Sequence, residues 1–439
     1  MYINEELNRQ NPWWVNSRVS AEDPAKPQRD ILPILRQRVL QRDLITAVVG
    51  LRRVGKTTAV RQIIDQLLQT GYCQDKLVYY SFEEGVASGE TLRAIVEYCL
   101  KMGGKDKTYL FLDEIQYVDG WNSILKKYFD LNPNLKFTVT GSSSLFIGTK
   151  ARESLAGRIQ EIIMYPLGYG EYLRIHKGLG LPAAKILSEE GLVSYTDELR
   201  ENFLAYLVGG EFPYLPRLTN WGEKREYVLD FVIGKVVEND LPRLKKIYKT
   251  TELTALSEAL ISGSGQLVEM QNLGTDLGIS RQSLRDYTAL LEKTHLISAV
   301  YNRGTGFRTR SRLRKIYSAS TNATVLKTSL GEQSESFSFK MGQYVETFVF
   351  NYLVRQQTGE IYFWRQRQKE VDFILVTPES VFPIEVKCQN RIRSSDMENL
   401  LYFCHKERLN QGVIVTRDKS GQETIKGVTI RFLPAHFLI

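Results

Sequence analysis

Two glycines, a lysine and a threonine stand close together early in the chain, at a spacing suited to holding phosphate. Residues 50–57 read Gly-Leu-Arg-Arg-Val-Gly-Lys-Thr. Glycines at these two positions let backbone N–H groups turn inward around a phosphate, and the first turn of a following helix attracts anions. Lys56 would contact the β- and γ-phosphates of ATP, and the Thr57 hydroxyl would coordinate Mg²⁺. The predicted nucleotide contacts are Gly50, Leu51, Arg52, Arg53, Val54, Gly55, Lys56, Thr57 and Thr58.

A pair of carboxylates ends a later apolar run. Residues 109–112 are Tyr-Leu-Phe-Leu, and Asp113 and Glu114 follow directly. At the carboxyl end of a strand, Asp113 would hold Mg²⁺ through water, and Glu114 would accept a proton from the attacking water or orient it. The alternative is that the two carboxylates only cap the next helix. Together with the glycine-rich loop, the pair indicates ATP hydrolysis.

Two further residues are candidates for the same reaction. Ser142 follows a predicted strand at residues 136–140 and would sense the γ-phosphate or orient water, unless it caps the next helix. Arg158 precedes another predicted strand and would stabilise transition-state charge in a neighbouring subunit. That role implies a homo-oligomer, whereas the alternative for Arg158 is a solvated cation at a helix end.

The segment that carries these residues alternates short apolar runs with amphipathic stretches. Strands are predicted at residues 44–49, 77–82, 109–112, 136–140 and 159–167, and helices at 57–68 and 91–100. Such alternation favours an α/β fold in which helices cover a parallel sheet. We assign residues 1–169 to this core. Residues 170–250 have helical periodicity and are assigned to a helical lid.

A helix-turn-helix pattern occupies residues 271–287. Gly278 allows the turn, and Ser280 is a good N-cap for the second helix. Side chains at the start of such a helix contact base edges, and arginines that alternate along a β-ribbon contact phosphates. No Asp or Glu occurs between Lys293 and Gly331. The predicted DNA contacts are Arg281, Gln282, Arg285, Arg303, Arg308, Arg310, Arg312 and Arg314.

We therefore assign residues 251–317 to a winged helix-turn-helix domain with DNA as its partner. The alternative is a winged helix that contacts protein and carries a solvated basic wing. Residues 318–338 are rich in serine and threonine and are predicted to be a linker before a last domain at 339–439.

The last domain brings carboxylates and a lysine onto neighbouring predicted strands. Asp372 lies on the second of three strands, and Glu346 lies on the helix before them. Glu385 and Lys387 share one face of the third strand. Oxygen ligands favour Mg²⁺ or Mn²⁺ over zinc, so Glu346, Asp372 and Glu385 are the predicted metal ligands. Lys387 would position the water that attacks a phosphodiester, and a folded but catalytically silent domain is the alternative.

Together these motifs resemble AAA+-type P-loop ATPases of the archaeal and bacterial family that has a nuclease-like C-terminal domain of the PD-(D/E)XK superfamily. The supporting stretches are residues 50–57, 112–116, 140–143 and 155–158, with Asn-Pro-Trp-Trp at 11–14 and Gly-Gly-Glu-Phe-Pro at 209–213. The resemblance implies that the strand before the loop is central in its sheet and that the lid closes over adenine. Val371 departs from the superfamily, where many members have proline.

Composition limits the class of protein. Its 439 residues include 58 Lys and Arg against 50 Asp and Glu, a formal net charge of +8 that permits a polyanionic partner. The longest apolar runs fall far short of the roughly 18 residues that a membrane span needs. With four cysteines that lack C-x-x-C spacing and no recognisable secretory signal, the protein is predicted to be cytoplasmic with no membrane partner. We interpret it as an ATP-hydrolysing, DNA-binding enzyme that acts on DNA with a metal-dependent nuclease-like C-terminal domain. The alternative is a nucleotide-controlled regulatory switch or a transcription-regulator-like DNA-binding protein with a silent nuclease fold.

Overall fold

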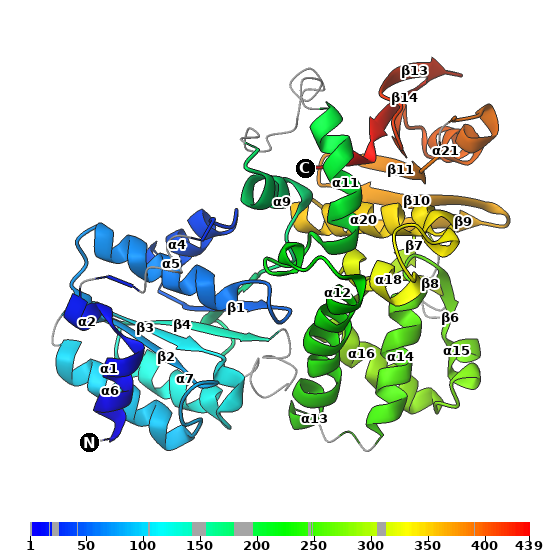
Figure 1. The fold of residues 1–439 in the computed structure, drawn as a ribbon. Coiled ribbons are helices and arrows are strands. Elements are labelled where there is room, and N and C mark those ends of the chain that lie inside the picture. The colour runs from blue at the N-terminus through cyan, green and yellow to red at the C-terminus, as the bar shows by residue number, and fades with distance from the viewer. Residues whose placement is uncertain are drawn as a thin grey trace. The chain divides into compact units, whose positions relative to one another are not determined.

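The computed structural model describes the chain except residues 1, 17, 20–25, 42, 104–105, 143–154, 180–195, 245–246, 248, 305–312 and 390. The chain divides into two compact units. The first comprises Met1–Tyr165 and Asn239–Ile247, and the second comprises Pro166–Glu238 and Tyr248–Ile439. Each unit has its own sheet (Figure 1).

The sheet of the first unit is parallel and follows the order β2-β3-β4-β1-β5. Its strands are β1 (Ile45–Gly50), β2 (Leu77–Ser81), β3 (Thr108–Asp113), β4 (Leu135–Ser142) and β5 (Ile159–Ile163). β1, β2 and β3 are buried along their whole length, as expected when helices cover both faces of a sheet. The strand before the glycine-rich loop is interior, between β4 and β5, but the middle strand is β4.

Helices lie on both sides of this sheet, with α4 and α5 on one side and α1, α6 and α7 on the other (Figure 1). Their bounds are α1 (Tyr2–Gln10), α2 (Trp13–Asn16), α4 (Leu32–Gln41), α5 (Lys56–Gln69), α6 (Gly89–Gly103) and α7 (Trp121–Leu131). The Asn-Pro-Trp-Trp motif covers the open edge of β2. Asn11 exchanges two hydrogen bonds with the Tyr79 backbone at 2.7 and 2.9 Å, and the Trp13 indole donates to the Leu77 carbonyl at 2.9 Å. An edge strand protected in this way cannot pair with another chain.

The sheet of the second unit has nine strands in the order β13-β14-β12-β11-β10-β9-β7-β8-β6. The strands are β6 (Leu267–Glu269), β7 (Ile297–Asn302), β8 (Leu313–Ser318), β9 (Glu360–Gln366), β10 (Lys369–Val376), β11 (Val381–Lys387), β12 (Gln411–Thr416), β13 (Gly421–Ile425) and β14 (Val428–Pro434). The helices are α9 (Tyr169–Lys177), α11 (Thr196–Gly209), α12 (Trp221–Val228), α14 (Thr250–Ser262), α15 (Met270–Asp276), α16 (Arg281–Lys293), α18 (Thr321–Thr328), α19 (Glu335–Phe339), α20 (Met341–Gln356) and α21 (Ser394–Glu407).

One sheet therefore joins the segments 251–317 and 339–439, which we had expected to be separate domains. β7 pairs in parallel with β9, and the Asn302 side chain fixes this pairing because it exchanges two hydrogen bonds of 2.9 Å with the Arg365 backbone. A single hydrophobic cluster also spans the unit and includes Tyr206, Tyr317 and Phe348. These three side chains come from the expected lid, winged helix and last domain.

Much of the predicted linker at 318–338 forms helices α18 and α19. Side chains of α18 are fully buried from Thr321 to Leu326. Ser320 caps this helix, and its side chain accepts the Ala323 N–H at 3.1 Å. Serine and threonine in this segment satisfy a buried helix start, although their abundance is typical of exposed linkers.

The expected lid at 170–250 is divided between the two units. Pro166–Glu238 is part of the second unit, in which α11 and α12 pack against α18. A π-helix, η4 (Leu229–Asp240), ends in the short segment that belongs to the first unit, and α13 (Leu241–Leu244) follows. Asp240, at the end of η4, therefore belongs to the first unit.

Candidate functional site

The glycine-rich loop connects β1 to α5, as predicted. Arg53 and Gly55 have positive φ angles of 64° and 100°. A Cβ atom at Gly50 would lie 2.2 Å from the Met164 carbonyl oxygen, so only glycine fits there. The backbone thus turns sharply from the strand into the helix, and the free N–H groups of the first turn of α5 face the loop.

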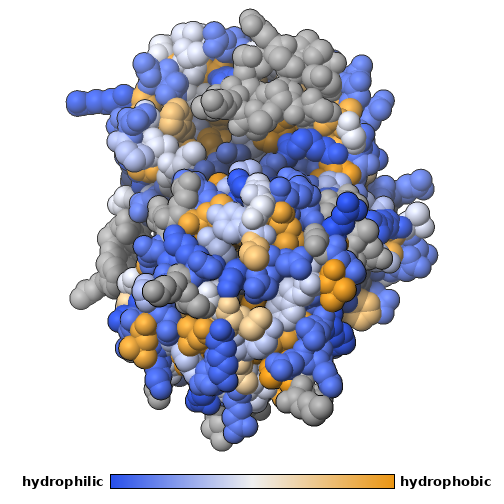
Figure 2. Space-filling view, turned by 90° about the vertical axis from the view of Figure 1, so that its left-hand side faces the viewer, coloured by the Kyte–Doolittle hydropathy of each residue, from blue (hydrophilic) through white to orange (hydrophobic). Residues whose placement is uncertain are grey.

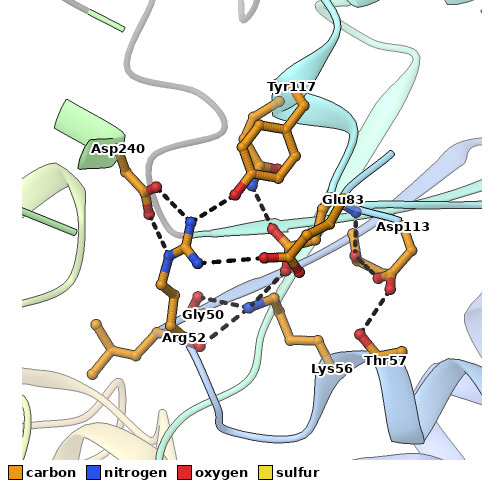
Figure 3. Close-up of polar contacts among 12 residues, drawn as sticks. Gly50, Arg52, Lys56, Thr57, Glu83, Asp113, Tyr117 and Asp240 are labelled. Atoms are coloured by element: carbon orange, nitrogen blue, oxygen red, sulfur yellow. Dashed lines mark hydrogen bonds and ion pairs between the residues drawn. The ribbon is translucent and has the colours of Figure 1, made fainter. Parts of the chain in front are cut away.

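Lys56 places a buried ammonium group inside this loop. Its Nζ donates to the carbonyl oxygens of Gly50 at 3.3 Å and Leu51 at 3.1 Å, and it lies 3.7 Å from Glu114 Oε1 (Figure 3). Carbonyl oxygens satisfy the ammonium only partly, and an anionic phosphate oxygen is a stronger acceptor. Lys56 is therefore in position to exchange these contacts for phosphate.

Asp113 lies at the end of β3 and accepts hydrogen bonds from three hydroxyl groups. Thr57 donates to its Oδ2 at 2.7 Å, Tyr79 donates to the same oxygen at 2.8 Å, and Thr140 donates to Oδ1. Burial, together with the negative charge of Glu114, raises the pKa of Asp113. A divalent cation would favour the ionised carboxylate. The Thr57 hydroxyl and the Asp113 carboxylate together offer oxygen ligands that fit Mg²⁺.

Glu114 leaves the strand direction directly after Asp113. Its φ angle is 52°, an uncommon value for a residue with a side chain, and its N–H donates to Thr140 Oγ1 at 3.0 Å. The Gln116 amide donates to Glu114 Oε2, which leaves Oε1 toward Lys56. Strained backbone of this kind is common at functional sites, and here it turns the carboxylate toward the loop.

Arg52, expected to contact the nucleotide, is held by an unpredicted partner. Its guanidinium makes two hydrogen bonds to Asp240, at 2.9 Å from Nε and 2.7 Å from Nη2, and a third to the Tyr117 hydroxyl at 2.8 Å (Figure 3). Glu83 lies 3.8 Å away. Arg52 therefore ties the loop to the end of η4.

Ser142 lies at the carboxyl end of the parallel sheet, and Arg158 lies at its amino end. Ser142 is buried and pairs in register with Gly50, so it lies beside the start of the loop. The residues that follow, 143–154, lie outside the described part of the chain. Arg158 precedes β5, whose Ile159 pairs with Ile45 at the start of β1, and its Nε lies 2.6 Å from Asp130 Oδ1. Arg158 cannot reach the loop of its own chain, and its role in a neighbouring subunit stays a prediction.

In the second unit, the predicted carboxylates do converge, but around a lysine. Lys315 Nζ lies 3.0 Å from Glu346 Oε1, 3.1 Å from Asp372 Oδ1 and 2.9 Å from Glu370 Oε1. The Tyr317 hydroxyl donates to Glu346 Oε1 at 2.7 Å. Burial and Asp372 raise the pKa of Glu346 to about 7. Lys315, Tyr317 and Glu370 were not among the predicted site residues.

Glu385 and Lys387 share a face of β11, as predicted, and form an ion pair of 2.7 Å. Asp372 is held against the same strand because its Oδ2 accepts the Val386 N–H at 2.9 Å. Glu385 is 4% exposed, and its Oε2 accepts no hydrogen bond. Burial and Asp372 raise the pKa of Glu385 to about 8.

The Mg²⁺ or Mn²⁺ site predicted for Glu346, Asp372 and Glu385 does not fit this arrangement. Among the residues that the structure describes, no group of three or more His, Cys, Asp or Glu side chains is arranged to hold a metal ion. The Lys315 ammonium contacts the first two carboxylates, and Lys387 contacts the third. A fixed cation stands where the metal was expected.

The helix-turn-helix segment forms the two predicted helices, α15 and α16. Gly278 has a φ angle of 65°, and the Ser280 side chain accepts the Ser283 N–H at 3.1 Å. At the start of α16, three predicted DNA contacts are exposed: Arg281, Gln282 and Arg285.

The predicted wing residues are less available. Arg303 lies 3.8 Å from Glu407, and Arg314 lies 3.9 Å from Glu292, so both guanidinium groups face carboxylates within the unit. Arg308, Arg310 and Arg312 lie outside the described residues. The described residues thus leave the start of α16 as the part of the predicted DNA surface that is exposed.

On the face drawn in Figure 2, no large hydrophobic patch marks a further site among the described residues. In the view of Figure 2, hydrophobic residues stand in small groups among hydrophilic ones. Exposed large side chains such as Val15 and Ile34 are of this scattered kind, which needs no partner to explain it. No helix in the described ranges is both long enough and apolar enough to span a membrane.

Comparison with known proteins supports the assignment of the first unit. Residues 42–173 match the family model of the AAA domain, which includes β1, the loop, β3 and β5. This match and the site geometry support an AAA-type P-loop ATPase domain. Residues 200–321 and 341–437 match two domains of unknown function, DUF8612 and DUF4143.

Two curated relatives of this chain are described as uncharacterised proteins. An uncharacterised protein of Haemophilus influenzae is 24% identical over 406 residues, covering 89% of this chain and 93% of that protein. An uncharacterised protein of Methanocaldococcus jannaschii is 24% identical over 343 residues, covering 75% and 72%. Among solved structures, the Aeropyrum pernix ORC1 protein in complex with DNA is 13% identical and covers 73% of this chain and 96% of that chain. Its TM-score of 0.30 is too low to indicate a shared overall fold.

Proposed function

We propose that the first unit binds ATP with Mg²⁺ and hydrolyses its γ-phosphate bond. The observation that supports this proposal is that four side chains meet at the carboxyl end of the parallel sheet. Lys56 and Thr57 begin α5, and the carboxylates of Asp113 and Glu114 meet them from the end of β3. A cation, an oxygen pair for Mg²⁺ and a carboxylate for water are the groups that phosphoryl transfer to water needs.

In the proposed reaction, water attacks the γ-phosphorus, and the bond from this phosphorus to the bridging oxygen breaks with its electron pair left on ADP. Glu114 orients the water and accepts its proton, which then passes to the released phosphate. Lys56 stabilises negative charge on the phosphate oxygens, and Thr57 and Asp113 hold Mg²⁺. Bound Mg²⁺ supplies positive charge to the phosphate oxygens. Ser142, in register with Gly50, is placed to contact the γ-phosphate.

Paired substitutions separate binding from hydrolysis. Lys56→Ala should abolish ATP binding, measured by calorimetry with Mg²⁺ present. Glu114→Gln should keep ATP affinity and lower phosphate release by roughly 10²-fold or more, as for loss of a general base. Asp119→Asn is the control, because this exposed carboxylate lies five residues after Glu114, beyond the short helix η2 (Ile115–Tyr117). Wild-type turnover in Glu114→Gln would contradict the proposed role.

DNA binding by the second unit is a second candidate function. It is favoured by the exposure of Arg281, Gln282 and Arg285 at the start of a capped second helix, the position from which such helices contact bases. The formal net charge of +8 is compatible with a polyanionic partner. In this proposal, the first unit hydrolyses ATP while the second unit of the same chain is bound to DNA.

A further inference from the structure

The carboxylate cluster of the second unit contains its own cation. Lys315 is 3% exposed, and its ammonium lies within 3.1 Å of three carboxylate oxygens. The ammonium donates hydrogen bonds to Glu346 and Asp372 and forms an ion pair with Glu370. Holding these partly buried carboxylates near one another without a cation would be unfavourable. Lys315 therefore supplies the positive charge that makes the cluster possible.

The position of Lys315 is fixed by the sheet and not by the side chain alone. On β8, Lys315 pairs with Val300 of β7 on one side and with Leu267 of β6 on the other. Two residues later, Tyr317 lies on the same face of the strand, donates to Glu346 at 2.7 Å and stacks on Phe350 with ring centroids 4.3 Å apart. The backbone and the aromatic stack thus hold β8 against the cluster.

A divalent metal and this ammonium would compete for the same carboxylate oxygens. Mg²⁺ or Mn²⁺ would bind carboxylate oxygens at about 2.0–2.4 Å. Bound to the oxygens of Glu346 and Asp372 that Lys315 contacts, the ion would lie within about 5 Å of Nζ, where two positive centres repel each other. The ammonium therefore opposes binding of a metal ion at these oxygens.

We propose that Lys315 takes the place of a divalent metal ion in this cluster. The second unit then keeps the carboxylate framework of a metal site in a permanently metal-free form, neutralised by a strand from the segment 251–317. Removing the ammonium should uncover a site for Mn²⁺ formed by Glu346 and Asp372, with Glu370 beside them. This inference is independent of the ATPase proposed for the first unit.

The test is titration of Mn²⁺ into the full chain without nucleotide, followed by calorimetry and by the loss of the free-ion electron paramagnetic resonance signal. Lys315→Met keeps an unbranched side chain, one atom shorter than lysine, and removes its charge. It should bind one more Mn²⁺ than the wild type, and the double variant Lys315→Met/Asp372→Asn should lose this additional ion. Lys315→Arg keeps a cation and should match the wild type. Any Mn²⁺ bound by the first unit is common to all four proteins.

Two results would overturn the proposal. One is a folded Lys315→Met protein, judged by wild-type ATP affinity and circular dichroism, that gains no Mn²⁺. The other is a wild type that loses a Mn²⁺ ion, or a Mn²⁺-dependent DNA cleavage, when only Asp372→Asn is introduced. If Lys315→Met is recovered unfolded, its recovery of folded protein is compared in Mn²⁺ and in Na⁺. Rescue by Mn²⁺ but not by Na⁺ at equal ionic strength supports the proposal, and failure of both contradicts it.

Discussion

The carboxylate of Glu211 should be a major source of stability in the second unit. It is fully buried and caps the start of α18. Its Oε2 accepts the Ser320 hydroxyl at 2.6 Å and the Asn322 N–H at 3.0 Å, and its Oε1 accepts the Thr321 N–H at 3.0 Å. In return, Asn322 accepts the Glu211 N–H at 2.9 Å. Two segments about 110 residues apart in the sequence are thus joined by reciprocal hydrogen bonds.

Glu211→Gln changes one acceptor to a donor while keeping the shape. The amide oxygen can replace Oε2, but the amide nitrogen would then face the Thr321 N–H and leave it unsatisfied. An orphaned buried donor costs about 1–3 kcal/mol, and the two remaining bonds lose about 1 kcal/mol when the acceptor is no longer charged. We expect the free energy of unfolding of the second unit to fall by about 2–4 kcal/mol.

The assay is urea unfolding followed by circular dichroism, with ATP affinity as a check that the first unit is intact. The matched control is Glu258→Gln, which removes a carboxylate that contacts the same helix. Glu258 pairs with Lys327 of α18 at 2.8 Å but is 53% exposed, so its loss should cost less than about 1 kcal/mol. Equal losses in the two variants would refute the reasoning that burial makes the Glu211 cap strong.

Two more outcomes are expected. Burial lowers the pKa of His436 from its ordinary value of 6.5 to about 4, so the unfolded chain binds a proton that the folded chain does not, and stability should fall as the pH drops from 6.5 toward 4. His436→Phe should reduce the drop in Tm between pH 7 and pH 5. Reversal of Arg281 and Arg285 to Glu should weaken DNA binding and lower the salt slope by about one per lost phosphate contact, and by more than Lys101→Glu in the first unit does. Equal affinities at low salt would move α16 to a protein-binding role.

The nucleotide site could be predicted because its signals are local. The loop between β1 and α5 is defined by eight consecutive residues, and Asp113 and Glu114 directly end an apolar strand. The strands of the first unit also lie close to their predicted ranges, since continuous apolar runs are typical of buried parallel strands.

Contacts between distant segments could not be read in the same way. Asp240 binds Arg52 across 188 positions, and no local pattern distinguishes it from any other acid at a helix end. In the sequence, nothing near Lys315 distinguishes it from the other cations of a basic ribbon. Its partners Glu346 and Asp372 lie 31 and 57 residues later. One local signal does indicate helix α18. Ser320 before Thr321–Thr328 is a good N-cap, although the serine and threonine content of the segment favours a linker.

The pairing of β7 with β9 limits how this chain can be divided in evolution. A gene fragment that ends before residue 339 would leave β7 with an open edge, and one that begins there would expose β9 and leave Glu346 and Asp372 without Lys315. Open strand edges promote aggregation, and unpaired buried carboxylates oppose folding. Although residues 200–321 and 341–437 match separate family models, recombination that transferred one without the other would yield two defective products. Selection should therefore keep the two segments together in one reading frame.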